Sequence, residues 1–116
     1  MQCFGFARRL LSVRDDETQN KIKSKFADDY EFRTYVQRYL RQLAPKAQVY
    51  YWLGLLSDTE GDAQQALTHY RKALYLEPQH AEALLHLATL LAAQGDEAGA
   101  RRLQERAARV GRESEP

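Results

Sequence analysis

The feature that most constrains this chain is an internal repeat of 34 residues in its second half. Shifting the sequence by that distance places Gly61-Asp62 on Gly95-Asp96, between two segments of apolar periodicity. The other matched pairs are Ala47 and Ala81, Leu53 and Leu87, Leu56 and Leu90, Ala66 and Ala100, and Ala73 and Ala107. A period of this length predicts a unit of helix, turn and helix that buries its apolar face only against neighbouring copies.

Turn and cap residues set the limits of the predicted helices. Gly61 and Gly95 are expected to end helices, because a positive φ costs glycine little. Asp62 and Asp96 are expected to start the following helices, since their carboxylates suit the free amides and the helix dipole there. Pro78 ends the second helix, because it lacks an amide hydrogen. The four helices are therefore predicted at 48–59, 62–76, 81–94 and 96–110.

Small residues recur where the two helices of one copy must approach each other. Gly54 and Ala66 hold these positions in the first copy, and Ala88 and Ala100 hold them in the second. A larger side chain there would hold the two backbones apart. The sequence therefore predicts closely packed antiparallel pairs.

The first copy resembles the tetratricopeptide repeat (TPR) family. The residues that carry the resemblance are Tyr50, Leu53, Gly54, Gly61, Ala66, Tyr70, Ala73, Leu74 and Pro78. The second copy keeps Leu84, Leu87, Ala88, Gly95, Ala100 and Ala107, and departs from the family pattern at Gln104 and Arg112. The resemblance implies an all-α fold with two TPR units, 47–80 and 81–114, that form a short α-solenoid stacked on N-terminal helices.

Residues 1–46 lack the repeat pattern and predict about three further helices. The first is a short stripe of apolar residues among arginines, and the second starts at Asp15, Asp16 and Glu17 and runs toward Phe26. The third is expected to open at Asp28 and Asp29 and to end before Pro45. Its apolar stripe is Phe32, Tyr35, Val36, Tyr39, Leu40 and Leu43, and the first helix has Phe4, Ala7, Leu10 and Leu11. We expect this segment to be a cap on the repeats or an assembly element.

Composition narrows the class of protein. With 44% hydrophobic and 28% charged residues and a net charge of +1, the chain is expected to be folded, and its overall charge gives no case for nucleic acid or membrane binding. Cys3 is the only cysteine, which excludes an intrachain disulfide and favours a reducing, cytoplasmic location. Local basic clusters leave nucleic-acid binding as a less favoured alternative. They are Arg8, Arg9, Arg14, Lys21, Lys23 and Lys25, and a second set of Arg101, Arg102, Arg106 and Arg109.

The resemblance implies that the first helix of each unit lines a concave groove for a protein partner. The groove residues carried over by position are Gln48, Tyr51, Trp52, Leu55, Asp58, Thr59, Glu82, Leu85, His86 and Thr89, followed by Ala92 and Ala93. Tyr51 and Trp52 are the expected anchors, because large flat side chains carry much of the energy in such sites. The alternative is that the N-terminal helices cover the groove and make both aromatics part of the core. The lysines and asparagines of the family's carboxylate clamp are absent, so a helical segment of a partner suits this surface better.

Catalysis has little support in the sequence. His69, His80 and His86 lack the spacing of a metal site, and no phosphate loop, nucleophile motif or paired carboxylates are present. Each histidine is expected to be solvated or packed, with no catalytic, metal or cofactor role. The chain alone is therefore not expected to be an enzyme.

A narrower resemblance covers most of the repeat region, in particular the stretch YRKALYLEPQHAEALLHLA. It is similar to the C-terminal TPR tail of CheR-class chemoreceptor methyltransferases of Wsp-type surface-sensing systems. The resemblance implies a docking or regulatory domain in chemotaxis-like signal transduction, with the methyltransferase part outside these residues. The chain is then a separate domain, a fragment or a fusion. The alternative function is self-assembly as a homodimer, because two repeats are fewer than such a solenoid usually needs.

Overall fold

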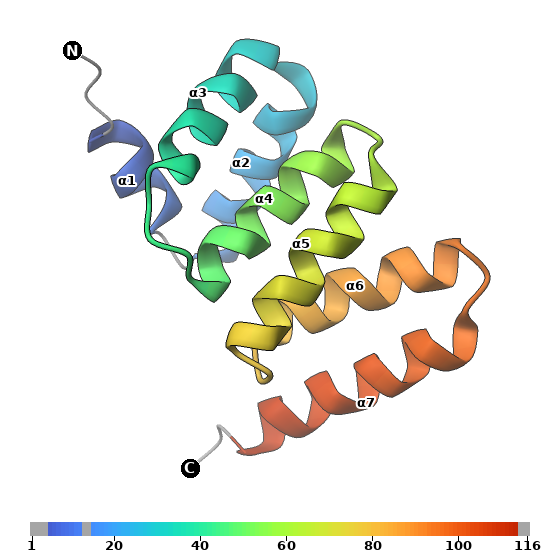
Figure 1. Cartoon of the computed structure of the whole chain (residues 1–116). Coiled ribbons are helices and arrows are strands. Elements are labelled where there is room, and N and C mark those ends of the chain that lie inside the picture. Colours follow the sequence, from blue (N-terminus) through green and yellow to red (C-terminus); the bar gives the residue numbers. More distant parts are fainter. Residues whose placement is uncertain (1–4, 13–14, 114–116) are drawn as a thin grey trace. The chain divides into compact units, whose positions relative to one another are not determined.

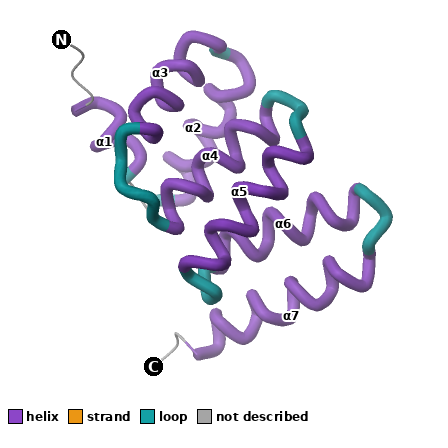
Figure 2. The backbone as a smooth tube through the Cα atoms, in the orientation of Figure 1, coloured by secondary structure: helices purple, strands orange, loops and turns teal. Residues whose placement is uncertain are grey.

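Every regular element in the described part of the chain is a helix. The computed structural model describes residues 5–12 and 15–113 (Figures 1 and 2). The chain divides into two compact units, residues 1–44 and 45–116. The described helices are α1 (Gly5–Leu11), α2 (Asp16–Asp28), α3 (Tyr30–Arg41), α4 (Ala47–Thr59), α5 (Ala63–Leu76), α6 (Ala81–Ala93) and α7 (Glu97–Glu113). The predicted all-α class is confirmed.

In the first unit, Asp29 joins two helices. Its backbone N–H donates to the Lys25 carbonyl at 2.9 Å, and its carboxylate accepts from the Phe32 N–H at 3.0 Å. One residue therefore ends α2 and caps α3. The expectation that Asp28 opens the third helix is wrong, because Asp28 is the last residue of α2. The third helix also ends earlier than expected, at Arg41, and a short loop precedes Pro45.

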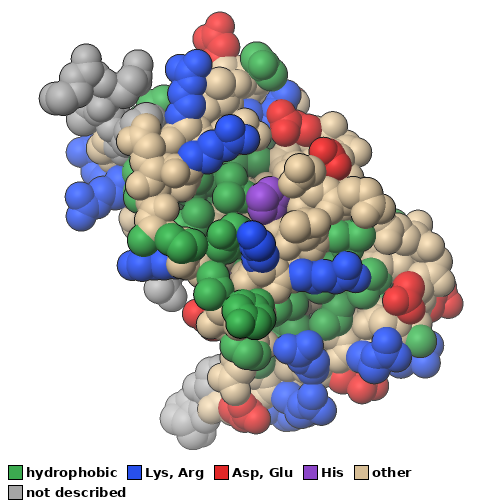
Figure 3. Space-filling view, viewed as in Figure 1, with side chains coloured by type: hydrophobic (Ala, Val, Ile, Leu, Met, Phe, Trp, Pro, Cys, Tyr) green, Lys and Arg blue, Asp and Glu red, His purple; other side chains and the backbone are tan. Residues whose placement is uncertain are grey.

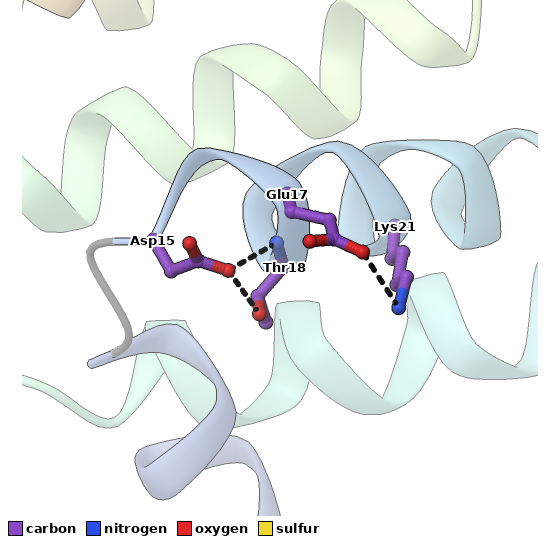
Figure 4. Close-up of polar contacts among 4 residues, drawn as sticks. All are labelled: Asp15, Glu17, Thr18 and Lys21. Carbon is purple, nitrogen blue, oxygen red and sulfur yellow. Dashed lines mark hydrogen bonds and ion pairs between the residues drawn. The ribbon is translucent and has the colours of Figure 1, made fainter.

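The start of α2 follows the predicted acidic pattern. The Asp15 carboxylate accepts from both the backbone N–H and the hydroxyl of Thr18, at 2.9 and 2.8 Å (Figure 4). These hydrogen bonds to Thr18 lower the pKa of Asp15. Glu17 and Lys21 form an exposed ion pair at 3.5 Å, which contributes little because solvent screens it.

The core of the first unit comes from successive turns of α2 and α3, whose buried apolar residues are spaced four apart. The rings of Phe26 and Phe32 lie 5.5 Å apart. In the predicted α3 stripe, Tyr35 and Tyr39 are half-buried and Leu43 is exposed beyond the end of the helix. Phe4 lies outside the described residues. The buried apolar residues of α2 and α3 are Ile22, Phe26, Phe32, Val36 and Leu40.

The second unit consists of two antiparallel helix pairs, α4 with α5 and α6 with α7, and α5 also contacts α6 (Figure 1). Gly61 and Gly95 have φ values of 81° and 94°, so both predicted left-handed turns are present. Asp62 accepts from the Gln65 N–H at 3.1 Å, and Asp96 accepts from the Gly99 N–H at 2.8 Å. The two aspartates are therefore caps that stand just before α5 and α7.

Gly54 is the point of closest approach between α4 and α5. A Cβ atom built on Gly54 would lie 2.5 Å from Cε1 of Tyr70, and the Tyr70 side chain is fully buried. Ala66 of α5 is buried too. Because Gly54 has no side chain, the Tyr70 ring fits into the core beside it. This is the close approach of the two helices that the sequence predicted.

Gly54→Ala tests this contact. The added methyl group overlaps the Tyr70 ring, and such overpacking costs about 1–3 kcal/mol. That cost exceeds the gain of about 1 kcal/mol that alanine brings to a helix over glycine. We expect the midpoint of urea-induced unfolding to fall in Gly54→Ala.

Gly111→Ala is the matched control, because Gly111 is also helical but its Cβ would meet nothing within 4 Å. Only the helix-propensity gain remains there, so its unfolding midpoint should stay or rise. Equal shifts of the unfolding midpoint in the two variants would show that a methyl group at residue 54 does not overlap the Tyr70 ring.

Candidate functional site

The ten residues expected in the groove do not form one exposed surface. The buried members are Tyr51, Trp52 and Leu55, all on α4. Glu82 and His86 of α6 are partly exposed, as is Thr59. The exposed members are Gln48, Asp58, Leu85 and Thr89.

The two expected anchors lie inside the fold. Tyr51 is 0% exposed and Trp52 is 1% exposed. Their rings contact each other, with centroids 5.7 Å apart. Both side chains are buried in this structure, whereas an anchor must be accessible to the partner, so their role in a groove stays a prediction.

Tyr51 connects the two repeats. Its ring stacks on that of His86 with centroids 5.4 Å apart and an interplanar angle of 14°, and its hydroxyl lies 3.2 Å from Nε2 of His86. The rings of His80 and Tyr70 lie 5.1 and 6.2 Å from it. Residues of α4, α5, α6 and the turn before α6 therefore meet at one side chain.

His80 has a defined tautomer and a structural role. Its Nδ1 accepts from the Ala83 N–H at 3.1 Å, which caps α6, so the ring proton lies on Nε2. Nε2 then donates to Oε1 of Gln48, at 2.7 Å. The sequence suggested only a packed or solvated histidine. Its place directly before the first residue of α6 was the signal for a cap, although histidine is an uncommon cap residue.

Burial keeps the two central tyrosines protonated. It is the main cause that raises the pKa of Tyr51, and a hydrogen bond to Glu82 and the charge of this carboxylate add to the shift. Burial likewise raises the pKa of Tyr70, with a smaller contribution from the charge of Asp58, whose own pKa burial raises. Within the described residues, the Tyr70 hydroxyl has no hydrogen-bond partner. These phenols are therefore packing groups at neutral pH.

The described residues bring together no set of metal-ligating side chains. No group of three or more His, Cys, Asp and Glu residues among them is placed to hold a metal ion. In the same part of the chain, no helix has the length and apolar character needed to cross a membrane.

Leu85 is the large apolar groove residue that remains accessible, and the small side chains of Ala92 and Ala93 are exposed as well. Leu85 is 49% exposed, while Leu84 and Leu87 on either side of it face the core. Thr89 follows one turn later, and Glu82 precedes by one turn. The exposed leucine of the expected groove therefore lies on α6, whereas the exposed members on α4 are the polar residues Gln48 and Asp58.

The raised tyrosine pKa values predict a loss of stability in alkali. Below pH 10, Tyr51 and Tyr70 are protonated in both the folded and unfolded states, so their ionisation does not lower the free energy of unfolding. Above pH 10 the unfolded chain gains free energy by ionising them, whereas the folded chain does not, so the free energy of unfolding falls as pH rises. Each such tyrosine contributes a slope of about 1.4 kcal/mol per pH unit.

Tyr70→Phe isolates one of the two contributions. We expect its free energy of unfolding, measured in urea from pH 9 to 11.5, to fall less steeply than that of the parent chain. At pH 7 the variant should be as stable or more stable, because the removed hydroxyl is buried without a partner. If the free energy of unfolding falls equally steeply with pH in both proteins, the raised pKa of Tyr70 is contradicted.

Comparison with known proteins places these features in a family. A model of the tetratricopeptide repeat family matches residues 59–116, half of the chain. Two relatives are each described as probable biofilm formation methyltransferase WspC. The Pseudomonas putida protein is 84% identical over 83 residues, which is 72% of this chain and 20% of that protein. The Pseudomonas aeruginosa protein is 67% identical over 79 residues, which is 68% of this chain and 19% of that protein.

A more distant relative is the photosystem I assembly protein Ycf3 of Cyanophora paradoxa. It is 38% identical over 53 residues, which is 46% of this chain and 31% of that protein. The chain spans about a fifth of the length of the two methyltransferase relatives and about a third of Ycf3.

The length of the P. putida match bears on the junction between the two units. A match over 83 of 116 residues must include residues 34–83, wherever it begins. It therefore takes in most of α3, the following loop and α4. The relative carries this junction within one sequence, which argues against a fusion at the start of the repeats. With both glycine turns, the aspartate caps and the stacked antiparallel pairs in place, the chain belongs to the tetratricopeptide repeat family.

Proposed function

We propose that this chain is a non-catalytic docking or regulatory module of a biofilm-formation methyltransferase, and that it binds a helical segment of another protein. The family supports an interaction role, because such repeats present helical surfaces to protein partners. The 84% identity to a segment of the P. putida WspC protein supports the chemosensory setting.

The observation that carries the proposal is Leu85. A half-exposed leucine in the middle of α6 is held outward by a helix whose other side is buried. Helix-in-groove partners present apolar anchors at helical spacing, and an exposed apolar side chain is the complement they need. Thr89 and Glu82 add polar points on either side of Leu85, which suits the rim of such a contact.

Competition in P. putida tests the proposal without a known partner. The free chain, produced in excess, should occupy the site used by the methyltransferase and reduce biofilm mass. Leu85→Asp should abolish the reduction, because a carboxylate cannot occupy an apolar contact without loss of its hydration. Biofilm mass at matched protein levels is the measurement.

Leu76→Asp is the matched control, because Leu76 is 47% exposed and lies on α5. It should reduce biofilm mass as the parent chain does, and circular dichroism should show that both variants fold. If Leu85→Asp inhibits biofilm formation as strongly as the parent chain, Leu85 on α6 does not contact the partner. An inactive parent chain would contradict the docking role itself.

A further inference from the structure

A hollow with an apolar floor and a basic rim lies between α5, α6 and α7. Its volume is about 360 Å³, within the range of about 300–1,000 Å³ found for ligand pockets. Leu87, Leu91 and Leu103 supply the apolar lining, and Arg71, Arg102 and Arg106 supply the charge. Figure 3 shows Lys and Arg side chains gathered around apolar ones over these helices.

The charge of the hollow is not balanced by the residues that line it. Its one acidic member is Asp96, whose carboxylate accepts from the Gly99 N–H at the start of α7. Within the described residues, Arg71 and Arg102 have no ion-pair partner. Arg106 donates to the Pro78 carbonyl at 3.1 Å. The rim therefore attracts an anion.

The 34-residue repeat provides an internal comparison. Leu87 and Asp96 of the hollow recur in the first copy as Leu53 and Asp62, and Arg106 has a basic counterpart in Lys72. Four other residues of the hollow do not recur. Leu91, Gly99, Arg102 and Leu103 stand where the first copy has Ser57, Gln65, Thr68 and His69. Leu87 and Leu103 are buried in the core, so packing of the repeats accounts for part of the floor, but it does not account for the exposed Arg102.

The hollow continues along α7. Arg106 also lines a second hollow of about 170 Å³, together with Arg109, Val110 and the acidic Glu113. From Asp96 to Val110 the helix rises about 21 Å at 1.5 Å per residue. That length matches about 14 residues of a helical peptide.

We propose that this surface binds an acidic segment of a partner protein, with apolar side chains on the leucines and carboxylates on the arginines. Arginine suits carboxylates because its planar fork can donate two parallel hydrogen bonds. Single-stranded nucleic acid fits less well, because it needs aromatic side chains for stacking and none lines either hollow. This surface is separate from Leu85, which lines neither hollow.

The probe is a 16-residue peptide of Glu and Leu with its leucines at helical spacing, and a Lys and Leu peptide of the same pattern is its counterpart. Amide shifts of the labelled chain should change around Leu91, Arg102 and Leu103 with the acidic peptide only. Arg102→Glu should weaken binding about tenfold, as expected for one charge-assisted hydrogen bond. Fluorescence anisotropy gives the Kd.

Arg101→Glu is the matched control, because Arg101 is exposed on the same helix but lies outside both hollows. It should leave the Kd nearly unchanged, and Leu85→Asp should do the same, which separates this inference from the proposed docking face. Equal losses in Arg101→Glu and Arg102→Glu would overturn the proposal. So would tighter binding of a single-stranded DNA oligomer or polyglutamate than of the Glu and Leu peptide.

Discussion

The absence of a side chain at Gly54 is the constraint on which the second unit depends. It lets the Tyr70 ring enter between α4 and α5, and Tyr70 in turn contacts the rings of Tyr51 and His86. The first pair of helices is thereby linked to the first helix of the second pair. The second pair has alanine and glutamine at the equivalent positions, Ala88 and Gln104, so the same contact is not repeated. The aromatic cluster is specific to the junction between the repeats.

The sequence predicted the parts of the fold that follow from local chemistry. A left-handed turn needs glycine, a helix start favours a carboxylate, and a close helix pair needs small residues, so Gly61, Asp62 and Gly54 could be assigned without a structure. Asp29 was harder, because an acidic pair before a helix does not show which residue ends the preceding helix. The cap formed by His80 was missed for a related reason, since a neutral imidazole nitrogen can replace the carboxylate but rarely does.

The candidate site was less predictable than the fold. The repeat register indicates toward which side of a helix a residue points, but burial also depends on the side chains packed around it. Tyr51 and Trp52 occupy positions that suit an anchor, yet both are buried. Leu85 occupies the place equivalent to Tyr51 in the second copy and remains half-exposed. Equivalent positions thus serve packing in one copy and are available for recognition in the other.

The ring of His80 also bears on how the second unit folds. One nitrogen caps the first turn of α6, and the other is held by Gln48 at the start of α4. The Ala83 N–H at the beginning of the second repeat therefore finds Nδ1 of His80 correctly oriented only when Gln48 of the first repeat is in place. Because starting a helix is the costly step in forming one, the two repeats should fold as a single cooperative unit rather than one at a time.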